Sequence, residues 1–476
     1  MEEQKRSCEL ERKGCGGCSM LSMPYRKQLK KKQKRLEQLL GKFGKVQPIL
    51  GMENPWNYRN KVISTFAKGK GKNLESGIYA QGSHRVLPVK TCFLHQPILD
   101  KAVEAVRRAV SDCKYQPYDE DRRTGLIRHV LVRHSLTTDE VMAVLVTASP
   151  VLPGAKAFVK KVRELCPNIT TIVQNVNARS TSAVLGDREK ILYGKGFITD
   201  SLCGVRFRIA ASSFYQVNPK QTEILYKKAI EAAGLNGKQT VLDAYCGVGT
   251  IGLTAAKHAK NVLGVELNKS AVQCAIENAK ANHLKNARFL CGDATRFIQK
   301  MAARAEQVNV VFMDPPRAGS TPEFLQAVSR MKPEKLVYIS CNPETLQRDL
   351  EILVKLRWKV ERIQGVDLFP MTEHVETVVL LSQQKPDDTI EIDLDLDELD
   401  ATSAELKATY QEIKDYVLKE FGLKVSSLYI SQVKRKCGIG VGENYNLPKS
   451  ENARVPQCPK EKEDAIKAAL KYYAMI

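Results

Sequence analysis

The stretch VLDAYCGVGT at residues 241–250 has the pattern of a buried strand that runs through a glycine-rich turn into a helix. Glycines in such a turn allow the backbone to approach a ligand closely at the carboxyl end of a parallel strand. The stretch lacks the third glycine of the dinucleotide-binding fingerprint, so the turn alone is a weak signal. It indicates a nucleotide-like ligand at the switch point of an α/β sheet.

Strand and helix patterns alternate around this turn from residue 219 onward. A helix is predicted at 219–234, and further strands are predicted at 262–266, 288–290, 308–313, 335–340 and 377–381. This alternation predicts a doubly wound α/β sheet. Upstream, alternating apolar runs predict an α+β domain, with strands at 61–66, 129–133 and 141–146 and helices near 96–112 and 153–165.

Two acidic residues follow the next two predicted strands. Glu266 ends the strand in GVELN, where a ribose presents its two hydroxyls, and Asp293 follows the third strand in CGDA, where an adenine amino group could be held. A strand with DxxCGxG, a strand with Glu and a strand with GDA form the arrangement of S-adenosylmethionine (SAM)-dependent methyltransferases. Another α/β nucleotide-binding protein is the alternative interpretation.

Two loops at the same predicted sheet edge carry reactive groups. The sequence DPPR at 314–317 follows the fourth strand, and its proline pair stiffens a loop of the kind that lines target pockets in methyltransferases acting on bases or amides. Cys341, in SCNP, follows the fifth strand. A cysteine beside the cofactor is well placed as a nucleophile, whereas a buried structural thiol is the alternative.

Five motifs, in order along the chain, resemble those of the RNA uracil-5 methyltransferase family: FYQVN at 214–218, DAYCGVGT at 243–250, DPPR at 314–317, SCNP at 340–343 and HVET at 374–377. The resemblance covers about residues 1–384. It implies that Cys341 is the nucleophile and Glu376 the base. It also implies that SAM is held by Gln216, Tyr245, Gly247, Gly249, Glu266, Asp293 and Asp314, although Asp314 or Arg317 could instead contact the uracil edge.

The chemistry of uracil methylation explains these residue types. Carbon 5 of uracil is too weak a nucleophile to take a methyl group from SAM until a thiolate has added to carbon 6. A base then removes the carbon 5 proton and the thiolate leaves, so the reaction needs a cysteine of lowered pKa and a carboxylate. The similar cytosine-5 RNA methyltransferases place a further cysteine in the loop after the fourth strand; DPPR has none, which favours uracil.

The chain has 13 cysteines, and its acidic, polar N-terminus lacks the apolar run of a signal peptide, which predicts a cytosolic, reduced protein. Cys8, Cys15 and Cys18 are closely spaced, and with Cys92 they suit a four-thiolate site, which spacing alone does not assign to iron–sulfur or zinc. The resemblance implies a [4Fe–4S] cluster, although this chain has six residues in the first gap where the family pattern has five. We expect the other thiols to be structural: Cys113, Cys166, Cys203, Cys246, Cys274, Cys291, Cys437 and Cys458.

A formal net charge of +21, from 74 basic and 53 acidic residues, predicts a polyanionic partner, nucleic acid first. The basic run at 26–35 predicts a helix that contacts phosphates. The expected organisation is a cysteine-cluster and basic-helix segment at 1–50, an RNA-binding α+β domain at 51–205 that contributes Cys92, a catalytic domain at 206–384, an acidic linker at 385–400 and a helical module at 401–476.

The module should contain helices at 401–422, 425–437 and 459–473, and it either contacts nucleic acid, packs on the enzyme or binds a protein. The leading interpretation of the whole chain is SAM-dependent methylation of uridine carbon 5 in RNA. The expected substrate is 23S rRNA, because the cysteine cluster is typical of the ribosomal branch of the family. The alternatives are the same chemistry on tRNA, methylation of another base or an amide, and an iron–sulfur RNA-binding protein without methyltransferase activity.

Overall fold

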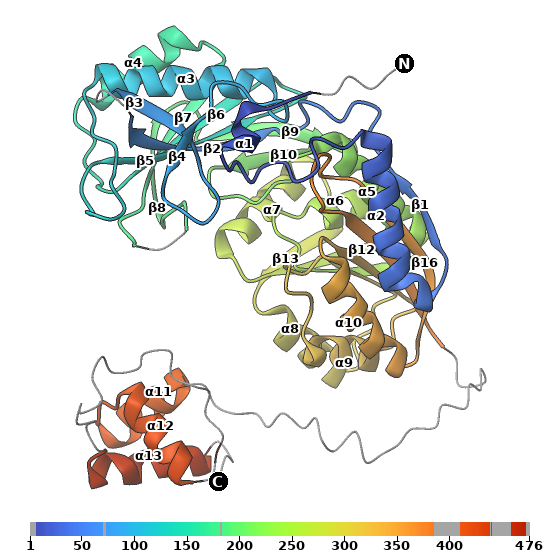
Figure 1. The fold of residues 1–476 in the computed structure, drawn as a ribbon. Coiled ribbons are helices and arrows are strands. Elements are labelled where there is room, and N and C mark those ends of the chain that lie inside the picture. The colour runs from blue at the N-terminus through green and yellow to red at the C-terminus, as the bar shows by residue number, and fades with distance from the viewer. Residues whose placement is uncertain are drawn as a thin grey trace. The chain divides into compact units, whose positions relative to one another are not determined.

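The computed structural model describes residues 6–69, 73–180, 183–384, 410–437, 439 and 458–472 (Figure 1). The chain forms two compact units, Met1–Pro386 and Asp387–Ile476. The predicted acidic linker at 385–400 lies outside the described residues. No described helix has the length and apolar character needed to cross a membrane.

The catalytic sheet has eight strands in the order β1-β16-β17-β15-β14-β11-β12-β13. Its strands are β1 (Val46–Leu50), β11 (Thr240–Ala244), β12 (Asn261–Glu266), β13 (Ala287–Cys291), β14 (Val310–Met313), β15 (Lys335–Ser340), β16 (Trp358–Val366) and β17 (Glu376–Gln383). The six strands predicted from 240 to 381 are confirmed. The sheet is mixed, however: β17 runs antiparallel to both β15 and β16, and β1 pairs in parallel with β16.

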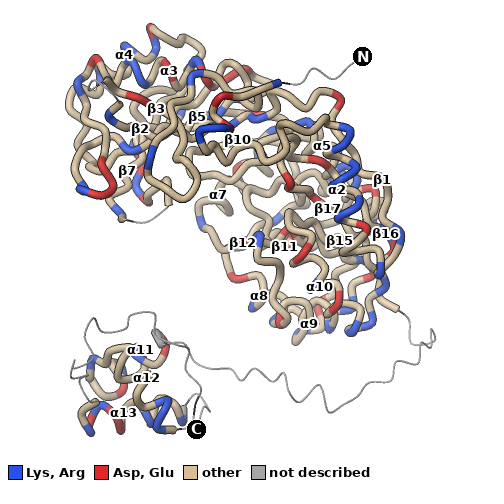
Figure 2. Tube along the Cα trace, viewed as in Figure 1, with Lys and Arg blue, Asp and Glu red and all other residues tan. Residues whose placement is uncertain are grey.

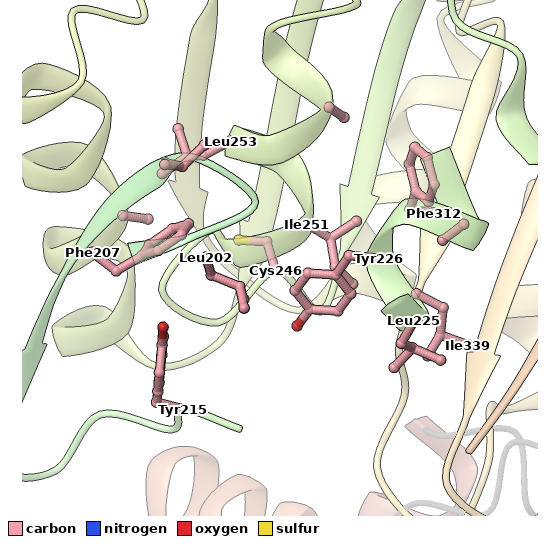
Figure 3. Packing of buried hydrophobic residues seen from close by; sticks show 14 of the residues in the cluster. Leu202, Phe207, Tyr215, Leu225, Tyr226, Cys246, Ile251, Leu253, Phe312 and Ile339 are labelled. Carbon is pink, nitrogen blue, oxygen red and sulfur yellow. The ribbon is translucent and has the colours of Figure 1, made fainter. Parts of the chain in front are cut away.

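Helices cover both faces of this sheet because successive side chains on a strand point to opposite faces. On one face lie α5 (Pro219–Ala233), α6 (Thr250–Ala256) and α7 (Lys269–Ala281), and on the other α2 (Tyr25–Leu40), α8 (Ala294–Ala303), α9 (Pro322–Met331) and α10 (Pro343–Lys355). Val241 of β11 packs in the first core and Leu242 in the second. Figure 3 shows the first core, where Tyr226 and Ile251 lie near Phe312 and Ile339.

A second sheet has seven strands in the order β4-β3-β2-β5-β6-β7-β8. They are β2 (Lys61–Lys68), β3 (Leu74–Tyr79), β4 (Val86–Pro88), β5 (Ile127–His134), β6 (Val141–Thr147), β7 (Ile169–Val176) and β8 (Arg188–Tyr193). The α+β prediction is confirmed for this region, since α3 (Pro97–Asp112) and α4 (Ala155–Leu165) pack on one face of the sheet.

The opposite face of the second sheet shares a core with the catalytic region. Leu131 and Met142 pack in the same cluster as Phe207 and Cys246. Phe207 belongs to the two-stranded hairpin of β9 (Phe197–Leu202) and β10 (Val205–Ala210), so the boundary expected at 205 falls within this hairpin. The two sheets therefore form one continuous packed unit.

The predicted basic helix is confirmed as part of α2, and it packs on the catalytic sheet. Lys32 is 2% exposed at its side chain, and its Nζ lies 2.6 Å from Asp367 Oδ1, just beyond β16. Tyr25 donates a hydrogen bond to the other oxygen of Asp367 at 2.7 Å. Figure 2 shows the basic residues along α2, which is preceded by α1 (Glu9–Arg12) and followed by the 3-10 turn η1 (Gly41–Phe43).

The second unit contains the three predicted helices, α11 (Tyr410–Phe421), α12 (Ser427–Lys436) and α13 (Lys460–Tyr472). Residues 401–409 of the first predicted helix lie outside the described residues. Ile413, Ile430 and Ile466 join the three helices in one small core. Lys436, in the basic last turn of α12, forms an ion pair with Glu463 of α13 at 2.6 Å, so this charge is paired within the module.

Candidate functional site

Strand register brings the predicted nucleophile and the predicted base to one edge of the catalytic sheet. In the antiparallel pair β15–β17, Ser340 lies opposite Thr377. Cys341 directly follows Ser340, and Glu376, the first residue of β17, directly precedes Thr377, so both lie at the end of this ladder, where Glu376 acts electrostatically on the Cys341 thiol. Asp314 follows Met313, which pairs with Tyr338 in the parallel ladder β14–β15, so Asp314 reaches the same edge.

Two buried carboxyl groups, those of Glu376 and Asp314, lie at this edge. Glu376 is 4% exposed, and burial, with a contribution from Asp314, raises its pKa to about 8. Burial raises the pKa of Asp314 to about 7. Arg317 is the cation that opposes the shift at Glu376.

The lowered pKa expected for Cys341 is not what the structure shows. Burial raises the pKa of its thiol to about 11, and the carboxyl groups of Glu376 and Asp314 add to the shift, while Arg317 opposes it. A thiolate is disfavoured there because low-dielectric surroundings and negative neighbours both penalise the charged form. The resting thiol is therefore protonated.

A pair formed by Arg317 and His374 joins the DPPR and HVET motifs. Arg317 Nη2 donates to His374 Nδ1 at 2.6 Å, and burial together with Arg317 lowers the pKa of His374, so the imidazole is a neutral acceptor. Asn342, beside Cys341, donates to the carbonyl of Arg317 at 3.3 Å. Three of the five motifs are thus held together by hydrogen bonds.

The predicted cofactor turn is fastened to the second strand by Glu266. Its carboxylate accepts from the backbone N–H of Gly247 at 3.1 Å and from that of Asn268 at 2.8 Å. Gly247 and Gly249 have φ of 56° and 84°, in the left-handed region that favours glycine. A Cβ on Gly249 would lie 3.0 Å from the Phe289 ring, whereas a Cβ on Gly247 would meet open space.

The remaining predicted cofactor residues lie on neighbouring segments. Asp293 caps α8, since its Oδ1 accepts from the N–H of Arg296 at 2.9 Å. Tyr245 has φ of 63°, and its ring centroid lies 5.3 Å from that of Phe324. Gln216 is held through its carbonyl, which accepts from Asn60 Nδ2 of the second-sheet region at 3.2 Å.

Asp243 was not assigned a role from the sequence. It is fully buried, its Oδ2 accepts from the N–H of Gly252 at 2.7 Å, and its Oδ1 has no hydrogen-bond partner among the residues that the structure describes. Burial raises its pKa to about 8, and the carboxyl groups of Asp314 and Glu266 add to the shift. The sequence feature that could have identified it is an acidic residue inside the apolar run VLDA, because acidic residues are seldom fully buried.

Asp349 of α10 was also missed, and it positions the loop after β14. It accepts from the N–H of Ser320 at 2.7 Å and from the hydroxyl of Tyr338 at 2.6 Å. The sequence shows Asp349 only as a polar residue of a helix, because its partners come from two other elements.

The four cysteines of the predicted metal site come near one another. Cys8, Cys18 and Cys92 pack around one small core with Tyr58 and Leu94. Burial raises the pKa of Cys18 to about 12, and Cys92, Cys15 and Cys8 add to the shift through their charge. Among the described residues, however, no three Cys, His, Asp or Glu side chains stand in a group that could hold a metal ion. All thirteen cysteines are free, and of the eight expected to be structural, Cys291 is exposed.

The sheet order, the glycine turn clasped by Glu266 and the loops that end β14 and β15 define the class of SAM-dependent methyltransferases. A family profile described as tRNA (Uracil-5-)-methyltransferase matches residues 160–384. An uncharacterized RNA methyltransferase of Halalkalibacterium halodurans is 40% identical over 372 residues, which are 77% of this chain and 81% of the relative. Another, of Listeria monocytogenes, is 43% identical over 373 residues, 77% of this chain and 82% of the relative.

A solved structure supports the same assignment. The tRNA (uracil-54, C5)-methyltransferase of Pyrococcus abyssi, in complex with S-adenosyl-L-homocysteine, superposes with a TM-score of 0.66 at 28% identity. The superposition covers 77% of this chain and 86% of the archaeal one. The chain therefore belongs to the same family as these RNA methyltransferases, and it is a SAM-dependent RNA methyltransferase whose residues 160–384 match the uracil-5 profile.

Proposed function

We propose that this enzyme methylates carbon 5 of a uridine in RNA through a covalent bond between Cys341 and carbon 6. The observation that carries the proposal is the register of β15 and β17, in which Cys341 follows Ser340 and Glu376 precedes Thr377 at one sheet edge. A nucleophile and a carboxylate on facing strand ends can act on adjacent ring carbons of one base.

In the proposed reaction, the Cys341 thiol gives up its proton to water, its sulfur forms a bond to carbon 6, and the electrons of the carbon 5–carbon 6 double bond move into an enolate. SAM supplies the methyl group that carbon 5 then takes. Glu376 accepts the carbon 5 proton, the double bond re-forms, and the bond between sulfur and carbon 6 breaks to release the thiolate. A carboxylate whose pKa lies near 8 suits this proton transfer, because a general base works best when its pKa is close to the working pH.

The raised pKa of Cys341 means that substrate binding must favour its thiolate. Arg317 is the neighbouring cation that already lowers the pKa, and it is held toward the site by His374. The positive sulfonium of SAM acts in the same direction on any nearby acid. We assign cofactor binding to Gln216, Tyr245, Gly247, Gly249, Glu266, Asp293 and Asp314.

We propose 23S rRNA as the substrate, in the cytosol. This proposal rests on the four-cysteine set, whereas the archaeal structural relative acts on tRNA according to its name. The test is incubation of anaerobically purified protein with labelled SAM and unmodified 23S rRNA, 16S rRNA or tRNA, followed by nucleoside analysis. Label in 5-methyluridine from 23S rRNA supports reaction and substrate together. Label only in tRNA overturns the substrate, and label in another nucleoside overturns the chemistry.

We also propose that Cys8, Cys15, Cys18 and Cys92 hold a [4Fe–4S] cluster. The support is that Cys8, Cys18 and Cys92 pack around one small core, and that burial and the charge of the neighbouring thiols raise the pKa values of Cys15 and Cys18, a penalty that bound cations would remove. A bound cluster would supply cross-links among the N-terminal segment and the loop that carries Cys92. Iron and acid-labile sulfide should co-purify with the protein and be lost in Cys18→Ser but kept in Cys113→Ser. Stoichiometric zinc without iron would contradict the cluster.

A further inference from the structure

Two basic side chains face each other across the second sheet. Lys61, the first residue of β2, lies directly opposite Arg133 of β5 in an antiparallel ladder. Arg59, two residues before β2, lies close enough to Lys61 for its charge to lower the pKa of that amine. Like charges directly opposite each other destabilise a sheet, so this arrangement needs a reason other than folding.

Lys61 and Arg133 form no ion pair within the described part of the chain, whereas Arg59 is hydrogen-bonded to the Tyr58 side chain and lies near the thiols of Cys92 and Cys18. Arg133 is 5% exposed, and the Nε atoms of Arg133 and Arg59 are buried without hydrogen-bond partners. Burial lowers the pKa of Lys61 to about 8, and Arg133 and Arg59 contribute to the shift. The carboxyl group that influences Arg133 is Glu189, and burial raises its pKa, which weakens it as a partner.

Arg133 and the residue before Lys61 are hydrogen-bonded to the segment 213–217, which carries the FYQV part of a predicted site motif. Asn60, between Arg59 and Lys61, donates its N–H to the carbonyl of Val217 at 2.9 Å. Arg133 donates to the carbonyl of Ser213. The same segment exposes 65% of Phe214. A positive, under-neutralised surface therefore adjoins an exposed aromatic side chain and Gln216.

We propose that Lys61, supported by Arg133 and Arg59, binds a backbone phosphate of the RNA next to the methylated uridine. The proposal rests on the RNA substrate of the proposed function and names the protein group that positions it. Lys61 is the contact residue because it is only partly buried, whereas Arg133 is closed off and acts through its charge. A phosphate supplies the anion that Lys61 and Arg133 lack, and phosphate contacts fix the register of a nucleic acid without reading its bases.

The test compares Lys61→Gln with Lys68→Gln, a matched control at the exposed far end of the same strand. RNA affinity of Lys61→Gln should fall about tenfold, and the slope of log affinity against log salt should shrink by about one. Lys68→Gln should keep both values. Lys61→Arg should restore most of the affinity because it keeps the charge.

Two further readouts separate this role from others. Thermal stability of the free Lys61→Gln protein should stay equal or rise, because the substitution removes a like-charge contact; a fall would assign Lys61 to the fold instead. SAM affinity should not change; a loss there would assign the anion to the carboxylate of SAM and overturn the proposal, as would unchanged RNA affinity. These outcomes can be told apart from failure of the proposed function. In that case the wild-type protein would form no 5-methyluridine, although its RNA affinity would still depend on Lys61.

Discussion

Two groups of buried ionisable side chains in the catalytic region differ in whether each charge has a partner. Lys32 and Asp367 form a closed pair at 2.6 Å, and Tyr25 donates a further hydrogen bond to the same carboxylate. Within the described residues no ion pair joins Asp314 or Glu376 to a cation, and burial raises the pKa of each. The first group fastens α2 to the end of β16, and the second surrounds Cys341.

This contrast separates structure from chemistry. A buried charge that has its partner in place is neutralised within the folded protein. A buried acid without a partner carries an unfavourable desolvation free energy, which a bound ligand can offset. If the proposed mechanism holds, binding of substrate and cofactor must bring the groups at this edge to their working protonation states. Breaking each group should affect a different property of the protein.

The largest effect is expected at Cys341. Cys341→Ala should lower methyl transfer by at least about 10⁴-fold, because without the thiol carbon 5 stays too weak a nucleophile. SAM affinity, measured by calorimetry, should stay within about twofold of the wild type. Cys274→Ala, a buried thiol on α7, is the control and should keep its activity. Substantial methylation by Cys341→Ala would overturn the covalent mechanism.

The next effect is expected at the closed pair. Lys32→Met should reduce the free energy of unfolding by about 3–5 kcal/mol, because it leaves Asp367 buried without its cation. A second substitution, Asp367→Leu, should recover much of that loss in the double variant. Denaturant unfolding followed by fluorescence measures both. If Lys32→Met were as stable as the wild type, the pair would not hold α2 in place.

The unpaired acids should make stability depend on pH. Their pKa values are raised in the folded protein, so the fold keeps protons that the unfolded chain releases at lower pH, and stability is lost as the pH rises through about 7 to 8. Each such group contributes a slope of up to about 1.4 kcal/mol per pH unit. Urea unfolding at several pH values should show a flatter dependence for Glu376→Gln. Identical slopes for variant and wild type would mean that Glu376 is already ionised.

The smallest effect is expected at the glycine turn. Gly249→Ala should lower stability by about 1–3 kcal/mol, because its Cβ would crowd Phe289 in addition to the strain of a positive φ. Gly247→Ala should cost only about 1 kcal/mol but should weaken SAM binding, since its Cβ would enter the open space on the ligand side. Equal SAM affinities for the two variants would remove Gly247 from the cofactor site.

The sequence predicted the elements whose signals are local. Apolar runs gave the strands from 240 to 340, and loop motifs at their ends located the acids and Cys341, because parallel strands end at one edge of a sheet. Strand β1 could not be predicted as a member of this sheet, since its partner β16 lies more than 300 residues further along the chain. β16 was missed because charged residues alternate with apolar ones in its first half.

The protonation state of the site also lay beyond the sequence. A motif shows that Cys341, Asp314 and Glu376 are present but not that burial raises all three pKa values, with neighbouring carboxyl groups adding to the shift at Cys341 and Glu376. The same holds for α2, whose basic run predicted phosphate contact: Lys31, Lys32 and Arg35 instead face Glu373, Asp367 and Glu344. Its outward-facing residues Arg26, Lys27, Lys30 and Lys34 still carry that prediction.

The most direct test of the account is the mass of the protein after Glu376→Gln is incubated with SAM and the RNA that the wild-type enzyme methylates. The account predicts a stable adduct of protein and methylated RNA, in which nuclease digestion leaves a methylated uridine attached to the peptide containing Cys341. Adding Cys341→Ala to this variant should abolish the adduct. Efficient turnover by Glu376→Gln without a trapped species, or an adduct at another residue, would contradict the assignment of Cys341 and Glu376.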